Sequence, residues 1–248
     1  MEYTVTRNPH NPMESAFMSS SFASRLVVFL LLLLLLPSTS GAESEDDGFT
    51  TLFDGTDLSR WQKSDTARWA IRDGVLALDG PHDGALNNAD YLWTREQYGD
   101  FVLEIEFKAC EGYCNSGVFL RTADLADPVF TGIEVQVSNS HGKRLSRGGT
   151  AGAIYDCLAP KKNTVRPAGE WNQYRITCCG NLITVELNGQ EITRMDLDRW
   201  TETGRNPDGT PNKFKRPLRD FARKGYVGLQ DHGRPIWYRN VRIRQIEE

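Results

Sequence analysis

The sequence lacks the features that mark several common protein classes. No basic run is long enough to suggest a nucleic-acid surface, and the formal net charge is −4, so nucleic acid is not an expected partner. The spacing of its cysteines and histidines matches no zinc pattern. We find no internal repeat and no strong helical periodicity, which argues against repeat proteins and helical bundles.

What is present indicates an ordinary folded protein. The chain has 248 residues, of which 39% are hydrophobic and 10% aromatic. This composition is neither disordered nor of low complexity. One soluble domain of moderate size is the simplest interpretation.

One long apolar run stands near the N-terminus. It covers residues 26–36, follows Arg25, and leads into small residues that end at Ala42. This order is typical of a secretory signal peptide, and about 11 apolar residues fall short of the roughly 20 that span a bilayer. We therefore expect residues 1–42 to be a signal peptide, with Met18 as the alternative true start.

The expected mature protein has a simple organisation. An acidic linker covers residues 43–47, and a single domain covers residues 48–248. The signal peptide predicts export, to the periplasm or outside the cell, and no stable membrane anchor after cleavage.

The chain has five cysteines, and an exported protein is free to form disulfides. Cys110 and Cys114 flank a short loop and are the first expected pair. Spacing does not support a bond from Cys157 to Cys178 or Cys179, and the odd count leaves at least one free thiol. A cysteine nucleophile is a less favoured alternative. Strand alternation predicts that Cys178 faces the core and Cys179 faces outward.

Many short segments with alternating polarity run along the chain, separated by glycine, asparagine and aspartate turns. Residues 101–107 place four apolar side chains on one face and Glu104 and Glu106 on the other. Asp73-Gly74 and Asn188-Gly189 are typical of tight hairpin turns. About twelve such strands predict an all-β fold, a two-sheet antiparallel β-sandwich of the jelly-roll kind.

Two neighbouring strands are expected over residues 115–121 and 132–137. In the second, Ile133, Val135 and Val137 share one face, and Glu134 and Gln136 share the other. Alternation places Arg121 on the polar side of the first strand.

The same pattern recurs near the C-terminus, where Gln230 and His232 alternate with apolar residues. Alternate residues of a half-buried sheet often face solvent without a function. A curved sheet that presents such a polar row can instead bind a neutral polar ligand such as a sugar.

Motifs spread along the chain resemble, in order, those of the 3-keto-disaccharide hydrolase family, over about residues 48–246. They are Gly48-Phe-x-x-Leu-Phe-Asp-Gly-x-x-Leu-x-x-Trp61, Asn115-Ser-Gly-Val-Phe-Leu-Arg121, Gly132-Ile-Glu-Val-Gln136, Gly152-Ala-Ile-Tyr-Asp156, Gly169-Glu-Trp-Asn172, Leu187-Asn-Gly189, Gly228-Leu-Gln-Asp-His-Gly233 and Arg239-Asn240. Cys178-Cys179 departs from the pattern. The resemblance implies the concanavalin A-like lectin/glucanase fold and cleavage of glycosides whose C3 is a ketone.

A ketone at C3 acidifies the C2 proton, so a base can form an enolate that expels the C1 substituent, after which water adds to the enone. We expect Glu134 to be the base, with His232 as its rival. Arg121 and Gln136 are expected to stabilise the developing charge, and His232 or Tyr155 to protonate the leaving group. The other expected substrate-binding residues are Gln230, Asn115, Tyr155, His141 and Trp171.

Other functions remain open from the sequence. An ordinary glycosidase needs two carboxylates, and only Glu104 or Glu106 offers a partner for Glu134. A carbohydrate-binding module is the non-enzymatic alternative, because the fold does not fix the function. Its sugar would stack on exposed aromatic residues. The candidates are Trp93, Trp171, Trp200 and Tyr155, whereas Trp61, Trp69 and Trp237 are expected in the core.

No cofactor is expected. A divalent cation held by His141, His232, Glu134 and Asp231 is the less favoured alternative. The loop from Asn206 to Lys224 is either a solvated excursion or a lid over the groove.

Overall fold

A computed structural model describes residues 47–63, 68–78 and 91–247. The expected signal peptide and all of the acidic linker except Asp47 lie outside these residues, so both remain predictions. Within the described ranges, no helix is long and apolar enough to cross a membrane.

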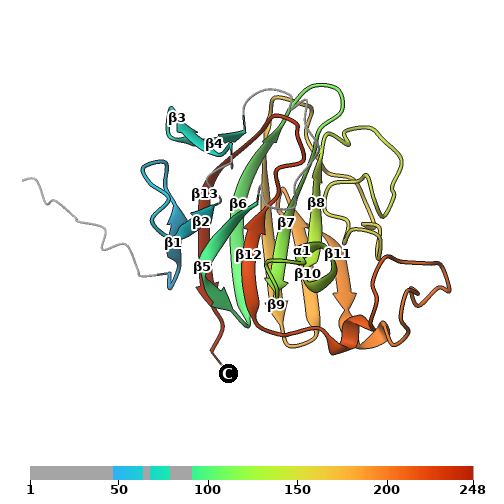
Figure 1. The fold of residues 1–248 in the computed structure, drawn as a ribbon. Coiled ribbons are helices and arrows are strands. Elements are labelled where there is room, and N and C mark those ends of the chain that lie inside the picture. The colour runs from blue at the N-terminus through green and yellow to red at the C-terminus, as the bar shows by residue number, and fades with distance from the viewer. Residues whose placement is uncertain (1–46, 64–67, 79–90, 248) are drawn as a thin grey trace, which may run out of the picture. The chain divides into compact units, whose positions relative to one another are not determined.

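The described strands form two antiparallel sheets (Figure 1). The larger sheet has eight strands in the order β11, β10, β9, β6, β13, β4, β3, and β1 pairs with β13. Its strands are β1 (Thr50–Phe53), β3 (Ala70–Arg72), β4 (Val75–Leu78), β6 (Phe101–Ala109), β9 (Trp171–Cys179), β10 (Leu182–Leu187), β11 (Gln190–Asp196) and β13 (Ile236–Gln245).

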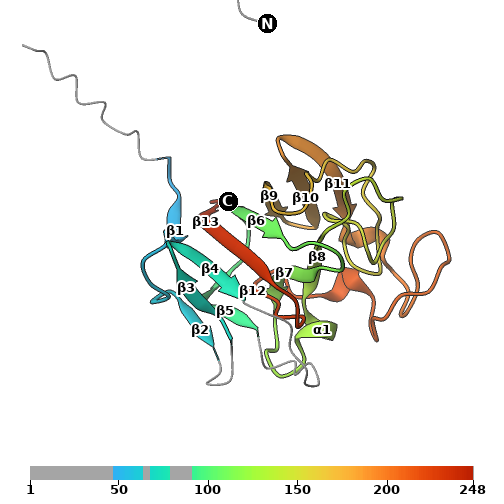
Figure 2. The same ribbon diagram turned by 90° about the horizontal axis from the view of Figure 1, so that it is seen from above.

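The smaller sheet has five strands in the order β2, β5, β12, β7, β8. They are β2 (Trp61–Lys63), β5 (Leu92–Tyr98), β12 (Gly225–Leu229), β7 (Asn115–Thr122) and β8 (Ile133–Ser138). The short helical elements are α1 (Pro128–Thr131), η1 (Leu197–Arg199) and η2 (Leu218–Asp220). Figure 2 shows β9, β10 and β11 on one side and β5, β12 and β7 on the other.

The core lies between the two sheets and follows from strand alternation. Leu103, Ile105 and Phe107 of β6 are fully buried, and so are Val135 and Val137 of β8. All five belong to one hydrophobic cluster. Burial of apolar side chains from both sheets in one layer is the driving force of a sandwich. The predicted all-β sandwich is confirmed.

Cysteine burial agrees with the sequence prediction, but the expected disulfide does not form. Cys178 is buried and Cys179 exposed, and all five cysteines are free thiols. The Cys110 Sγ lies 3.7 Å from the Tyr113 carbonyl oxygen, and the Cys114 Sγ lies 3.6 Å from that of Pro235. The two thiols are therefore directed at different carbonyl groups.

Two loop segments carry short regular structure. The loop that follows η1 contains the 3₁₀ helix η2. The segment around Ile154 forms isolated bridges to Val135 and Leu158. This segment runs beside β8, because the Tyr155 N–H donates to the Glu134 carbonyl oxygen at 2.9 Å.

Candidate functional site

Two rows of side chains cross the outer face of the five-stranded sheet. In the first row, Trp93, Gly228, Phe119 and Glu134 lie opposite one another on β5, β12, β7 and β8. Opposite residues of neighbouring strands share a face of the sheet. The first row therefore places a carboxylate at the end of an aromatic surface.

The aromatic residues of the first row form a cluster separate from the main core. Tyr91 stacks on Trp93 with ring centroids 5.0 Å apart, and both rings meet the edge of Phe119. Leu125 and Tyr226 pack against these three rings. Gly228 makes the arrangement possible, because a Cβ there would lie 2.1 Å from the Trp93 ring.

The second row is polar. Gln136 lies opposite Gly117, and the Gln230 N–H donates to the Gly117 carbonyl oxygen at 3.0 Å. The Gln230 Nε2 donates to the Tyr91 hydroxyl at 3.1 Å, and the Gln136 Nε2 donates to the Asn115 Oδ1 at 2.7 Å. Four of the residues expected from sequence, Glu134, Gln136, Gln230 and Asn115, therefore lie on one face of one sheet.

Gly117 sets the position of the Glu134 carboxylate. A Cβ at residue 117 would lie 2.6 Å from the Glu134 Oε1 and 2.8 Å from its Cγ. Such distances are shorter than any ordinary contact, so the carboxylate lies directly above the glycine backbone. A larger residue at this position must push the carboxylate aside.

Glu134 is buried, with 6% of its surface exposed. Burial raises its pKa from 4.5 to about 7, and the charge of Lys213 opposes part of that rise. Phe119, directly opposite on β7, removes water from one side of the carboxylate. A carboxylate with a pKa near neutral pH is suited to exchange protons with a substrate.

Lys213 is a functional candidate that the sequence analysis did not identify. Its Nζ lies 3.8 Å from the Glu134 Oε2 and 4.7 Å from the centroid of the Tyr155 ring. Burial lowers the pKa of Lys213, and the charge of Glu134 opposes that shift. Lys213 lies in the loop from Asn206 to Lys224, which the sequence marks as either a solvated excursion or a lid over the groove. That expectation is the sequence signal that could have identified Lys213.

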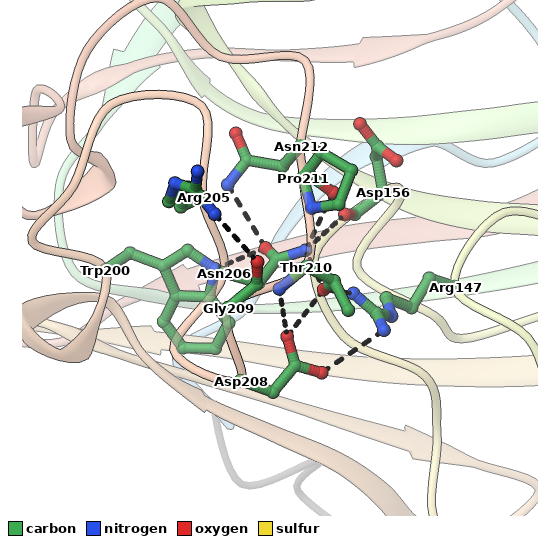
Figure 3. A network of polar contacts seen from close by, with 10 residues as sticks. All are labelled: Arg147, Asp156, Trp200, Arg205, Asn206, Asp208, Gly209, Thr210, Pro211 and Asn212. Carbon is green, nitrogen blue, oxygen red and sulfur yellow. Dashed lines mark hydrogen bonds and ion pairs between the residues drawn. The ribbon is translucent and has the colours of Figure 1, made fainter.

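A polar network holds the loop that carries Lys213 (Figure 3). The Asp156 Oδ2 accepts from the Lys213 N–H at 2.6 Å, and the Asp156 carbonyl oxygen accepts from the Asn206 Nδ2 at 3.1 Å. The Asn206 Oδ1 accepts from the Trp200 Nε1 at 2.8 Å and from Asn212. The backbone of Lys213 is therefore hydrogen-bonded to Asp156, the residue that follows Tyr155.

Tyr155 lies at the same place. Its N–H bonds to Glu134, its ring faces the Lys213 ammonium, and burial together with the charge of Glu134 raises its pKa. The structure thus brings this predicted residue to Glu134.

Two amide oxygens are left without partners in the described part of the chain. They are the Gln136 Oε1 and the Gln230 Oε1, and both are buried. A buried acceptor without a hydrogen bond is costly and in a native protein calls for a donor. Hydroxyl groups of a bound sugar are such donors.

Arg121 is not part of this group, contrary to expectation. Its φ angle is 50°, and a β-bulge falls here, because Leu120 and Arg121 together oppose Val227. A bulge of this kind breaks the alternation of side chains. The guanidinium bonds to the carbonyl oxygens of Gly99 and Gly180 and to the Asp100 carboxylate.

Trp171 and the two other candidate carboxylates belong to the larger sheet. Trp171 is half-buried at the start of β9 and lies against Lys108 and Arg239, with the Arg239 guanidinium 4.1 Å from its ring centroid. Glu104 bonds to Arg242 and Glu106 to Arg239. Neither carboxylate is a partner for Glu134, since both lie on the outer face of the other sheet.

The tryptophans follow the sequence predictions only in part. Trp61 and Trp69 are buried, but Trp237 is half-buried on the outer face of the larger sheet, with Lys108 over its ring. Strand alternation on β13 turns it away from Tyr238, which is fully buried. Trp93 and Trp200, expected to be exposed, are buried.

His141 is also away from the Glu134 group, because its Nδ1 lies 2.8 Å from the Val165 carbonyl oxygen on an exposed loop. His232 is half-buried just after β12 and makes no hydrogen bond or ion pair within the described residues. Asp231 is paired with Arg68 at 2.7 Å. The described residues contain no group of three metal-ligating side chains.

Comparison with known families fits this geometry. Residues 48–244 match the family of 3-keto-alpha-glucoside-1,2-lyase-like domains. The chain belongs to this family. A 3-keto-disaccharide hydrolase of Bacteroides thetaiotaomicron is 24% identical over 231 residues, which are 81% of this chain and 79% of that protein. The family match and this relative together support a carbohydrate hydrolase.

Solved structures show the same fold. A candidate glycosyl hydrolase of Parabacteroides distasonis is 33% identical, with a TM-score of 0.70 and coverage of 80% of this chain and 99% of its own. A second such protein from that organism is 25% identical, with a TM-score of 0.57 and coverage of 81% of this chain and 84% of its own.

Proposed function

We propose that the protein cleaves glycosides and disaccharides that carry a ketone at C3, by elimination across C1 and C2 followed by addition of water. The observation that carries this proposal is Glu134, a buried carboxylate with a pKa of about 7, held over Gly117 and beside Lys213. The comparisons support the same reaction, because the matching family is named for a 1,2-lyase and the relative for hydrolysis of a 3-keto-disaccharide.

Glu134 is proposed to take the proton from C2. The electron pair of the C2–H bond moves into a C2–C3 double bond and the ketone becomes an enolate oxygen. Lys213 replaces Arg121 as the group that stabilises this oxygen, since its Nζ and the Glu134 Oε2 are 3.8 Å apart. Two groups at this separation reach neighbouring atoms of one sugar ring, here the C2 hydrogen and the C3 oxygen. A fixed positive charge at the developing oxyanion lowers the barrier to proton removal.

The enolate then reforms the ketone and expels the C1 substituent, whose oxygen takes a proton. Tyr155, beside Glu134 and Lys213, is the preferred donor of this proton, and His232 is the rival. Water adds to C1 of the enone, and C2 recovers a proton. The sum of these steps is hydrolysis with no change in oxidation state.

The remaining polar groups suit a sugar ring. The unpaired oxygens of Gln136 and Gln230 accept hydrogen bonds from hydroxyl groups, and the Tyr91 hydroxyl lies beside Gln230. The absence of a second carboxylate beside Glu134 in the described residues argues against an ordinary glycosidase, which needs two.

The test offers purified protein a 3-keto-disaccharide and its unoxidised parent. Cleavage of the keto sugar alone is the expected result. Cleavage of the parent at a similar rate supports an ordinary glycosidase and contradicts the proposal. Binding of both sugars without cleavage supports a carbohydrate-binding module and also contradicts it.

A further inference from the structure

One exposed aromatic residue stands beside the candidate site. Tyr113 has 63% of its surface exposed, more than any other large hydrophobic residue in the described ranges. It lies on the loop between β6 and β7, two residues before Asn115. Single exposed aromatic residues are common, so exposure alone assigns no role.

The Tyr113 ring is held in place by the site itself. Its hydroxyl accepts from the Asn115 Nδ2 at 3.2 Å, and the Asn115 Oδ1 accepts from the Gln136 Nε2 at 2.7 Å. The Arg234 guanidinium lies 5.6 Å from the ring centroid. The loop is also fixed by a bond from the Asn139 Nδ2 to the Gly112 carbonyl oxygen. The Tyr113 ring is therefore exposed to solvent but held in one orientation by residues of the binding face, which suits it to contact a ligand.

The two ends of the binding face differ. Toward Phe119 the face ends in the aromatic cluster, where Leu125 and Tyr226 pack against buried rings. Toward Asn115 the polar row ends at the half-buried Asn115 itself, and Tyr113 lies beyond it. A ligand longer than one sugar ring therefore extends toward Tyr113.

We propose that Tyr113 forms a second subsite, in which its ring stacks on the second sugar of a 3-keto-disaccharide while Asn115 and Arg234 contact the hydroxyl groups of that sugar. An aromatic ring flanked by an amide and a guanidinium suits a polyhydroxylated ring, which has both apolar faces and polar edges. This inference rests on the proposed function, because it assumes that the keto sugar lies over Glu134.

The experiment compares a 3-keto-disaccharide with the methyl 3-keto-glucoside, which lacks the second ring. For the wild type we expect the lower KM with the disaccharide. Tyr113→Ala should reduce this preference, measured as the ratio of the two KM values, by about tenfold, the effect of losing one aromatic contact. Tyr113→Trp keeps the stacking surface and should retain most of the preference. Leu182→Ala, at an exposed position on the larger sheet, is the matched control.

An unchanged KM ratio in Tyr113→Ala overturns the subsite. So does an equal loss with both substrates, because a second-ring subsite does not act on the methyl glycoside. If the wild type cleaves neither keto sugar, the proposed function fails and the subsite is tested by titration calorimetry with the same two ligands. Weaker binding of the disaccharide to Tyr113→Ala then supports the subsite, and equal binding to both proteins contradicts it.

Discussion

The outer faces of the two sheets carry similar residues in different surroundings. On the larger sheet, the buried Glu104 is bonded to Arg242, and the half-buried Glu106 is bonded to Arg239. On the smaller sheet, Glu134 is buried and its only ion-pair partner among the described residues is Lys213, 3.8 Å away. Each of these glutamates sits on a strand at a position whose neighbours face the core.

The difference shows that surroundings, not residue type, decide what a strand glutamate can do. Glu104 and Glu106 are each hydrogen-bonded to arginine side chains, which is a structural use. Burial beside Phe119 raises the pKa of Glu134 to about 7, and this makes proton transfer near neutral pH feasible. Substitutions on the outer face of one sheet, with controls on the other sheet, test this difference.

The largest expected effect is that of Glu134→Gln. Loss of the base should reduce kcat/KM for a 3-keto-disaccharide by a factor of roughly 10² to 10⁴, while circular dichroism shows a folded protein. The matched control is Glu106→Gln on the other sheet, which should change kcat/KM little. Comparable losses in both variants contradict the assignment of the base.

The pH dependence of kcat/KM is a second test of Glu134 as the base. The base acts in its charged form, so kcat/KM of the wild type should rise as pH increases through about 7. Lys213 lowers the pKa of Glu134, so Lys213→Met should move this rise to higher pH and reduce kcat/KM by roughly 10²-fold. Lys213→Arg keeps the charge and should lose less. A profile that does not move in Lys213→Met contradicts the pairing.

A smaller loss is expected from Gly117→Ala. The added methyl group displaces the Glu134 carboxylate without removing it, and displacement of a catalytic group by about 1 Å costs up to roughly 10²-fold. We expect kcat to fall more than the melting temperature. Gly189→Ala, on the hairpin between β10 and β11 of the other sheet, is a useful control, since no atom lies near its Cβ position, although its positive φ adds some strain. A wild-type kcat in Gly117→Ala contradicts the claim that Gly117 positions the Glu134 carboxylate for catalysis.

The smallest effect on the reaction is expected at Arg121. Its removal leaves the Asp100 carboxylate and two carbonyl groups without their donor, so Arg121→Met should lower the free energy of unfolding by about 2–4 kcal/mol. The folded fraction should keep near wild-type kcat/KM at low temperature. Denaturant titration and rate measurement on one sample separate the two effects. A large loss of kcat with unchanged stability restores Arg121 to the site.

Strand alternation was enough to predict the sandwich and to group Glu134, Gln136 and Gln230, and the family motifs added Asn115. It failed at Arg121, because a bulge with positive φ reverses the side chain and no sequence pattern marks that bulge. It failed at Trp171 because alternation gives a side of a strand but not the sheet to which the strand belongs.

Lys213 and Tyr113 escaped the sequence analysis for a related reason. Both lie on loops, where no periodicity fixes the direction of a side chain. The place of Lys213 depends on a tertiary hydrogen bond, which its N–H donates to the Asp156 carboxylate, and only the fold brings these two segments together. The Tyr113 ring is oriented by a local bond that the Asn115 Nδ2 donates to its hydroxyl, which no strand pattern predicts.

The most direct test of the account measures the C2–H bond itself. A 3-keto-disaccharide with deuterium at C2 is compared with the unlabelled sugar under single-turnover conditions. If Glu134 removes the C2 proton, the labelled sugar should be cleaved more slowly, with the difference largest where proton removal limits the rate. Equal rates, together with no exchange of C2 hydrogen with deuterated water during turnover, contradict elimination and the role of Glu134 as its base.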